Sequence, residues 1–245
     1  TAILNILNHQ SLIATKAARI CYAAEGDGIM EFGLRRAQGP DAGIYGARAA
    51  VIGGCAGTSN VLTGQMFDVP VMGTHAHSWI MSFDDEYTAF YTYAKLYPMA
   101  CTLLVDTYDT LNSGVPNAIK VFKQMKKEGI ELKNYGIRLD SGDLAYLSKK
   151  ARKMLDDAGF KDATITASND LDEFLIASLK MQGAEITNWG VGTNLITSKD
   201  CPSFGGVYKL AAIMEDGENF TPKIKLSDNS EKITNPGNKK IYRIY

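Results

Sequence analysis

The stretch YGIRLDSGDLAYLSKKARKMLDDAG, residues 135–159, decides the fold that this sequence predicts. It opens with an apolar run at 135–139, typical of a strand that is buried on both faces. Apolar side chains then recur at three- and four-residue steps over 144–158, as on one face of a helix, and Gly159 is the expected stop. Polar residues 140–143 separate the two parts. The stretch therefore predicts one strand–helix unit of a parallel sheet.

Similar units lie on both sides of this stretch. Apolar runs predict further strands at 101–105, 163–167 and 186–191. The helix after the 163–167 strand is expected to begin near Asp170, with Glu173 in capping-box spacing. The units repeat at about 25–35 residues and are numerous enough for most of a (β/α) barrel. A doubly wound open sheet is the alternative, disfavoured because no GxGxxG motif follows the first strand.

We therefore predict a mixed α/β protein whose main part is an irregular (β/α) barrel. A helical segment at 1–25 leads into a barrel domain at 26–204. Strands are expected at 207–214 and 223–226 in a final antiparallel portion, 205–245. Because the chain starts without methionine inside a helical pattern and stops inside a strand-like one, we expect it to be a piece of a longer protein.

Composition restricts the classes of function. The net charge of -1 gives no basic excess for a nucleic-acid partner. No apolar run approaches the roughly 20 residues that span a bilayer, so no membrane partner is expected. The four cysteines are widely spaced without a CxxC pair, which favours free thiols in a reducing, cytoplasmic compartment over disulfides or zinc.

Polar residues gather where the predicted strands end, which is where barrel enzymes carry their chemistry. These strand ends hold residues 73–78, Asp106, Arg138 with 140–143, 168–170 and 190–193. None of them carries a lysine, which disfavours a Schiff-base aldolase or another lyase of that kind. The glycine-rich end at 190–193 suits a phosphate, although such a sequence is also common in turns.

The histidines at these ends leave two interpretations open. His75 and His77 are two residues apart and would share one face of a strand. They could bind a metal together, but the only other histidine is His9, which disfavours zinc. For His75 we favour a structural role. For His77 the pattern alone supports a functional role and a structural role about equally. Asp170 is equally well explained as a helix N-cap.

One stretch, EFGLRRAQGPD at 31–41, resembles the signature of nicotinate phosphoribosyltransferases. The resemblance continues, in the order of the family, through GTSN at 57–60, GTHAHS at 73–78, RLDSGDL at 138–144, GVGT at 190–193 and GGVYKL at 205–210. It implies the type II phosphoribosyltransferase fold, an irregular α/β barrel beside an α/β sandwich built from the two chain ends. The strands at 205–245 would then belong to an incomplete sandwich, and a homodimer is implied.

The resemblance also implies a reaction. Nicotinate and phosphoribosyl pyrophosphate would give nicotinate mononucleotide and pyrophosphate, in NAD biosynthesis. ATP hydrolysis would be coupled through a phosphohistidine, which falls on His77, with ATP as co-substrate and Mg²⁺ as cofactor. Asp140 is placed to hold ribose hydroxyls or magnesium, and with Asp106 it would stabilise the positive charge that develops on the sugar.

Substrate-binding roles fall on further residues of the same motifs. Thr74 and Arg138 resemble nicotinate-site residues, Phe32 the aromatic residue that stacks on the pyridine ring, and Arg35 the basic residue beside it. Nicotinate is a planar anion, which an aromatic face and an arginine fork would recognise.

Other positions are implied for the phosphoribosyl part of the site. Gly192 and Thr193 resemble residues of the phosphoribosyl pyrophosphate site, and Ser59 and Asn169 are counted with the substrate-binding residues. Ala76 stands where the related nicotinamide enzymes have an acidic residue, which favours nicotinate.

The sequence departs from the family in one respect, because the N-terminal portion that would complete the nicotinate site is not in it. Two alternatives remain within the fold, a nicotinamide and a quinolinate phosphoribosyltransferase. A third is a non-catalytic core that only binds phosphoribosyl ligands.

Overall fold

The computed structural model describes residues 1–215 and 217–244 and divides the chain into two compact units. One unit is Leu7–Phe204, and the other joins Thr1–Ile6 to Gly205–Tyr245. The helices of the described residues are α1 Ala2–Ala23, α2 Pro40–Ile52, α3 Val61–Phe67, α4 His77–Met81, α5 Glu86–Leu96, α6 Val115–Lys127, α7 Leu144–Asp157, α8 Glu173–Met181 and α9 Thr193–Ile196. The strands are β1 Gly28–Glu31, β2 Gly57–Thr58, β3 Thr102–Leu104, β4 Gly136–Leu139, β5 Thr164–Ala167, β6 Asn188–Val191, β7 Ala212–Met214 and β8 Phe220–Pro222.

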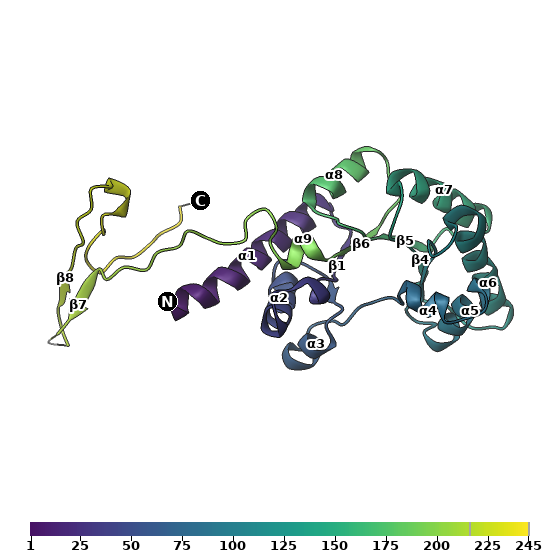
Figure 1. The fold of residues 1–245 in the computed structure, drawn as a ribbon, viewed down its shortest axis with the longest axis horizontal. Coiled ribbons are helices and arrows are strands. Elements are labelled where there is room, and N and C mark those ends of the chain that lie inside the picture. The colour runs from purple at the N-terminus through teal and green to yellow at the C-terminus, as the bar shows by residue number, and fades with distance from the viewer. Residues whose placement is uncertain (216, 245) are drawn as a thin grey trace. The chain divides into compact units, whose positions relative to one another are not determined.

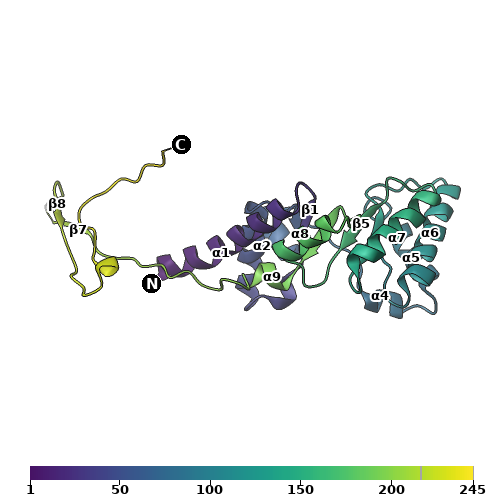
Figure 2. The same cartoon turned by 90° about the horizontal axis from the view of Figure 1, so that it is seen from above.

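Six of these strands form one parallel sheet in the order β2-β1-β6-β5-β4-β3 (Figure 1). Helices α4 to α7 lie around its β3–β5 side, and α1, α2, α8 and α9 lie near β1 and β6, as Figure 2 shows from a second direction. The mixed α/β architecture predicted from the sequence is confirmed. Each loop at the carboxyl end of a strand therefore meets the same side of the sheet.

The decisive stretch folds as predicted. Strand β4 is followed by α7, whose N-cap Asp143 accepts a hydrogen bond from the Tyr146 amide at 3.0 Å. The cap satisfies one of the amides that the first helical turn leaves without a partner. Gly159 ends the unit at a φ of 89°, a left-handed conformation that glycine adopts without strain.

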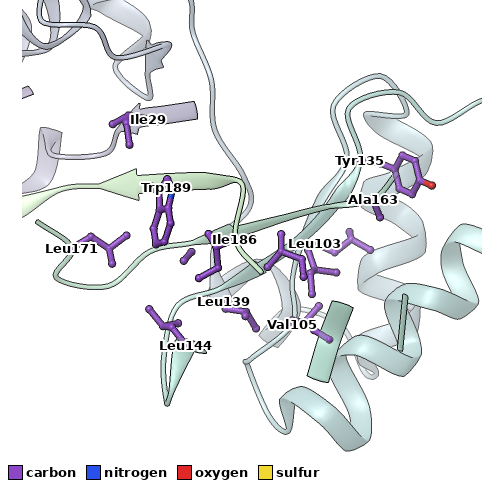
Figure 3. Close-up of a cluster of buried hydrophobic side chains, with 14 of the residues drawn as sticks. Ile29, Leu103, Val105, Tyr135, Leu139, Leu144, Ala163, Leu171, Ile186 and Trp189 are labelled. Carbon is purple, nitrogen blue, oxygen red and sulfur yellow. The ribbon is translucent and has the colours of Figure 1, made fainter. Parts of the chain in front are cut away.

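A single hydrophobic cluster lies between the sheet and its helices, and Figure 3 shows side chains of β1, β3, β4 and β6 within it. Trp189 and Phe122 are among its largest fully buried side chains. The Phe122 ring packs edge-on against Tyr135 and Phe160, with centroids 5.0 and 5.6 Å away. These contacts join α6 to the residue that precedes β4 and to the segment that follows α7.

The two end strands of the sheet, β2 and β3, do not pair with each other in the described residues, and the segment 70–76 contacts both. The apolar residues that precede the 73–78 motif form one parallel bridge, between Val71 and Thr58. The Thr58 amide donates to the Pro70 carbonyl at 3.0 Å, and the Met72 amide donates to the Thr58 carbonyl at 2.9 Å. On the other side, the ring of His75 reaches β3, where the Leu104 amide donates to its Nε2 at 3.2 Å. The segment 70–76 thus lies between β2 and β3.

One helix start was predicted wrongly. The N-cap of α8 is Asp172, whose carboxylate accepts from the Leu175 amide at 2.8 Å, and not Asp170. Asn169 and Asp170 have φ values of 92° and 47°. The chain therefore turns in the left-handed region before the helix begins, and a capping-box spacing alone cannot reveal such a turn.

The predicted antiparallel strands at the end of the chain are confirmed, but their bounds were wrong. Among the residues that the structure describes in this portion, β7 and β8 pair, with Ile213 opposite Thr221, and the 223–226 segment is not a strand. Ile224 and Leu226 are 57% and 75% exposed, so the apolar face of that alternating segment is not buried. Alternation predicts a strand only where a neighbouring surface covers one face.

No helix within residues 1–215 and 217–244 has both the length and the apolar character that a membrane span requires.

The close approach of β4 to β5 gives a first prediction. A Cβ on Gly136 would lie 2.1 Å from the Thr164 carbonyl oxygen, a backbone atom that cannot move without disturbing the sheet. Gly136→Ala should lower the free energy of unfolding by about 1–3 kcal/mol, measured by urea denaturation. Gly205→Ala, where a Cβ meets nothing within 4 Å, is the control and should change little. Equal midpoints for the two variants would contradict this strand packing.

Candidate active site

A cavity of about 520 Å³ opens at the carboxyl ends of the strands. All the site residues predicted from the sequence line it, except Asp106, whose carboxylate accepts a hydrogen bond from the Asp140 amide. The lining residues are Phe32, Arg35, Arg36, Ser59, Gly73, Thr74, Ala76, His77, Leu104, Arg138, Asp140, Ser168, Asn169, Asp170, Gly190, Gly192 and Thr193. Side chains from motifs far apart in the sequence therefore meet in one place.

Arg138, in β4, connects three of the surrounding loops. Its Nε donates to Ser168 Oγ at 2.8 Å, its Nη1 to Thr74 Oγ1 at 2.8 Å, and its Nη2 to Asp140 Oδ1 at 2.9 Å. The Arg138 side chain is 16% exposed, so most of the guanidinium is out of water. A guanidinium in this setting is held in one orientation by the fixed fork of its donors.

Phe32 lies between this guanidinium and β6. The Arg138 guanidinium carbon is 5.4 Å from the centroid of the Phe32 ring. Behind the ring, a Cβ on Gly190 would lie 2.6 Å from its Cδ2 and Cε2 atoms. Only glycine at this position leaves room for the ring. A planar ligand that stacks on Phe32 must therefore share its open face with the guanidinium or displace it.

Buried Glu31 fixes the loops on either side of Phe32. Its carboxylate accepts hydrogen bonds from Thr58 Oγ1 at 2.6 Å and from the Gly33 amide. Burial raises the pKa of Glu31, and the bonds from Thr58 and Gly33 oppose that rise. The Ser59 amide donates to the Glu31 carbonyl at 3.0 Å, which places Ser59 on the cavity wall.

His77 is the first residue of α4 and faces two carboxylates. Its Nδ1 lies 3.0 Å from Thr107 Oγ1. Its Nε2 lies 3.6 Å from Asp140 Oδ2 and 4.0 Å from Asp106 Oδ1. The Thr107 contact leaves Nε2 as the ring nitrogen that is turned toward the carboxylates.

The carboxylates of Asp106 and Asp140 differ in their hydrogen-bond partners. The Asp106 side chain is 1% exposed. Its Oδ2 accepts from the Asp140 amide at 2.9 Å and from Ser141 Oγ at 2.5 Å. Its Oδ1 has no hydrogen-bond partner among the described residues. Burial by itself would raise the pKa of Asp140, but hydrogen bonding from Ser168 and the charge and hydrogen bond of Arg138 outweigh it, so that pKa is lowered. The site thus keeps a charged Asp140 beside a buried carboxylate with a free oxygen.

His75 does not share a face with His77, contrary to the sequence-based expectation. The strand-like segment has ended, and α4 begins at His77, so the two rings point to different surroundings. The His75 ring packs edge-on against Tyr93, with centroids 4.6 Å apart, and is 7% exposed. Burial lowers the pKa of His75 to about 4; the Ala76 carbonyl opposes this, and the nearby Arg138 and His77 add to it. The predicted structural role is confirmed, as a packed residue.

The glycine-rich end of β6 lies under Phe32. Gly192 precedes α9, and a Cβ there would lie 3.2 Å from the Phe32 carbonyl oxygen. Thr193 begins the helix and lines the cavity, with Asn169 also on its wall. This end of the cavity presents main-chain groups and small polar side chains, which suit phosphate oxygens.

The sequence placed Ser168 and Gly190 at strand ends but could not reveal their partners. Arg138 lies on β4 and Phe32 directly after β1, and neither pairing can be predicted from the sequence. Arg36 and Leu104 also line the cavity. Arg36 follows Arg35 in a short 3-10 helix, Leu34–Arg36, and its place in the motif is the signal that could have found it. Nothing in the sequence distinguishes Leu104 from other strand residues.

Metal ligands are sparse in the described part of the chain, which holds no group of three or more His, Cys, Asp or Glu side chains able to bind an ion together. Asp106 and Asp140 are the carboxylates nearest His77.

A sequence model described as the nicotinate phosphoribosyltransferase (NAPRTase) family matches residues 28–243. The chain belongs to this family. Among its family relatives, the nicotinate phosphoribosyltransferase of Bacillus subtilis (strain 168) is 59% identical over 244 residues, which cover 100% of this chain and 49% of that protein. The human nicotinate phosphoribosyltransferase is 34% identical over 298 residues, which cover 100% of this chain and 54% of that protein. The chain spans about half the length of the curated relatives it matches.

Two solved structures have a similar fold. The crystal structure of human nicotinic acid phosphoribosyltransferase matches with a TM-score of 0.71 and 32% identity, covering 78% of this chain and 49% of that one. The crystal structure of nicotinate-nucleotide pyrophosphorylase from Pyrococcus furiosus matches with a TM-score of 0.68 and 29% identity. The match covers 80% of this chain and 49% of that one. These matches confirm the predicted type II phosphoribosyltransferase fold.

The buried His75 gives a prediction about pH. An unfolded histidine titrates near a pKa of about 6.5, and the buried ring near about 4. As pH falls through this window the unfolded chain takes up a proton that the native chain refuses, so His75 makes the native state lose up to about 3 kcal/mol. His75→Gln should lose less stability between pH 7 and pH 4.5 than the unchanged chain, as measured by urea unfolding. Parallel losses in both proteins would contradict the buried, neutral ring.

Proposed function

We propose that the complete protein transfers the phosphoribosyl group of phosphoribosyl pyrophosphate to nicotinate, giving nicotinate mononucleotide and pyrophosphate in NAD biosynthesis. The observation that carries this proposal is the set Arg138, Phe32 and Thr74, joined in one cavity with His77 and Asp140. The relatives named above are nicotinate phosphoribosyltransferases, which supports the same reaction here.

Recognition of nicotinate uses its shape and its charge. The ring would stack on Phe32 and share its open face with the Arg138 guanidinium. The carboxylate would take donors from Arg138 and the Thr74 hydroxyl. Arg35 and Arg36 add positive charge to the same cavity. A charge-assisted hydrogen bond contributes about 1.5–3 kcal/mol. That is roughly a ten- to hundredfold preference for the acid over the amide.

The phosphoribosyl donor would occupy the β6 end of the cavity. Gly192, Thr193, Ser59 and Asn169 offer main-chain and side-chain donors to its phosphates. Breaking the bond between ribose and pyrophosphate builds positive charge on the sugar, and Asp140, kept charged by its neighbours, is placed to stabilise it.

Magnesium fits the same carboxylates. Mg²⁺ is commonly held by one or two carboxylates together with substrate phosphates, and the partnerless Oδ1 of Asp106 beside Asp140 matches that donor set. When bound there, the ion would neutralise charge on the leaving pyrophosphate.

ATP would act as co-substrate through His77. Its Nε2 would attack the terminal phosphorus of ATP, forming the N–P bond as the bond to ADP breaks. Thr107 fixes the ring for this attack through Nδ1. A phosphoryl group on His77 would bring negative charge and acceptor oxygens next to Asp140, and so bias the position of the 73–77 loop.

The organisation of the complete enzyme is also a proposal. Residues 1–25, 26–204 and 205–245 would serve as helical lead, catalytic barrel and part of an α/β sandwich, in a homodimer. The free thiols Cys21, Cys55, Cys101 and Cys201 support a reducing, cytoplasmic location.

The coupling step is tested by labelling. The full-length protein incubated with terminally labelled ATP and Mg²⁺ should acquire an acid-labile phosphoryl group, and His77→Asn should acquire none. His9→Asn, a histidine in α1, is the control and should keep the label. A label that persists in His77→Asn would overturn the assignment of the phosphoryl acceptor.

The substrate pocket is tested at Gly190. Gly190→Ala should push the Phe32 ring toward the cavity and raise the KM for nicotinate about tenfold or more, since small displacements of substrate-positioning groups have large effects. Gly73→Ala is the control, because it also lines the cavity but its Cβ would meet nothing within 4 Å. Steady-state rates of nicotinate mononucleotide formation give both constants. Equal KM values for Gly190→Ala and the unchanged enzyme would refute stacking on Phe32.

A further inference from the structure

The outer edge of β3 has an amide whose partner is a side chain. The Val105 amide donates to the Arg138 carbonyl at 3.1 Å, so it points toward β4. Since successive amides of a strand point to opposite edges, the Leu104 amide faces away from β4. Its acceptor is His75 Nε2, at 3.2 Å. The ring thus takes the place that a strand carbonyl would fill if the sheet closed regularly.

His75 is suited to this role by its protonation. Because Nε2 accepts, the ring proton is on Nδ1, which lies 3.4 Å from the Ala76 carbonyl oxygen. Burial against Tyr93 and Phe90 keeps the ring neutral. Both ring nitrogens therefore have partners on the main chain, and neither is turned toward the cavity.

The hydrogen bond between Leu104 and His75 lies next to Arg138, the residue that connects the loops of the site. Leu104 is the register partner of Arg138 in the β3–β4 pair. On the other side of the bond, Thr74 precedes His75 and accepts from Arg138 Nη1 at 2.8 Å. His77 follows two residues later, with Nε2 3.6 Å from Asp140 Oδ2. The bond between His75 and Leu104 therefore connects the loop that carries Thr74 and His77 to β3, next to the bond that connects the same loop to Arg138 in β4.

We propose that His75 is a positioning residue, which closes the barrel between β2 and β3 through its hydrogen bond to Leu104 and thereby sets Thr74 against Arg138 and His77 against Asp140. A ring that only filled space would be replaced equally well by any apolar side chain of similar volume. A closing hydrogen bond instead requires an acceptor at the place of Nε2. The effect on catalysis rests on the proposed function, whereas the closure itself does not.

The test compares His75→Leu with His75→Gln in the full-length protein. Leucine keeps apolar volume but has no acceptor, and the glutamine amide oxygen can accept from the Leu104 amide. Hydrogen exchange of that amide should speed up about tenfold or more in His75→Leu and return toward the original rate in His75→Gln. Tyr93→Leu, which removes packing from the ring but no hydrogen bond, is the control and should leave the exchange close to the original rate.

Activity gives the second measurement. In His75→Leu, kcat and the rate of His77 labelling by ATP should fall about tenfold or more, and His75→Gln should restore most of both. Exchange at Leu104 that is equally slow in His75→Leu overturns the closure. If the Leu104 amide of His75→Leu exchanges fast while kcat and the labelling of His77 stay at their original values, the positioning role is overturned. An unchanged enzyme that makes no nicotinate mononucleotide overturns the proposed function alone, and the exchange of Leu104 still decides the closure.

Discussion

The site depends on one guanidinium. Arg138 donates to Ser168, Thr74 and Asp140, which belong to three different loops, and it covers the open face of Phe32. Its charge is compensated by Asp140, whose pKa it helps to hold low. Because a buried guanidinium is costly unless its donors have acceptors, the three loops and the arginine stabilise one another. The cavity is therefore shaped before a ligand arrives, with a cation and an anion in fixed places.

Local periodicity predicted the parts of the fold that local interactions decide. The unit at 135–159 follows its apolar spacing, and the polar residues of the strand ends meet because parallel strands align their carboxyl ends. The sequence could not reveal partners across strands, such as Ser168 for Arg138 or His75 for Leu104, about 30 residues apart. His75 and His77 were wrongly placed on one face because the strand stops at the Val71 bridge.

The errors share a physical origin. The Asp170 cap failed because two residues with positive φ turn the chain before α8. The 223–226 strand failed because Ile224 and Leu226 are not buried against any part of the chain that the structure describes. In both cases the pattern was correct for an isolated element and the surroundings decided otherwise. The roles proposed for the site residues rest on several motifs that stand in family order, since each motif alone has an equally good structural explanation.

We propose that Arg138 both holds the cavity together and binds the carboxylate of nicotinate. Calorimetric titration of nicotinate and nicotinamide into the full-length protein and into Arg138→Gln tests it most directly. Nicotinate should bind the unchanged protein roughly ten- to a hundredfold more tightly than nicotinamide. Arg138→Gln should lose that preference. A preference of the same size in Arg138→Gln would contradict the account.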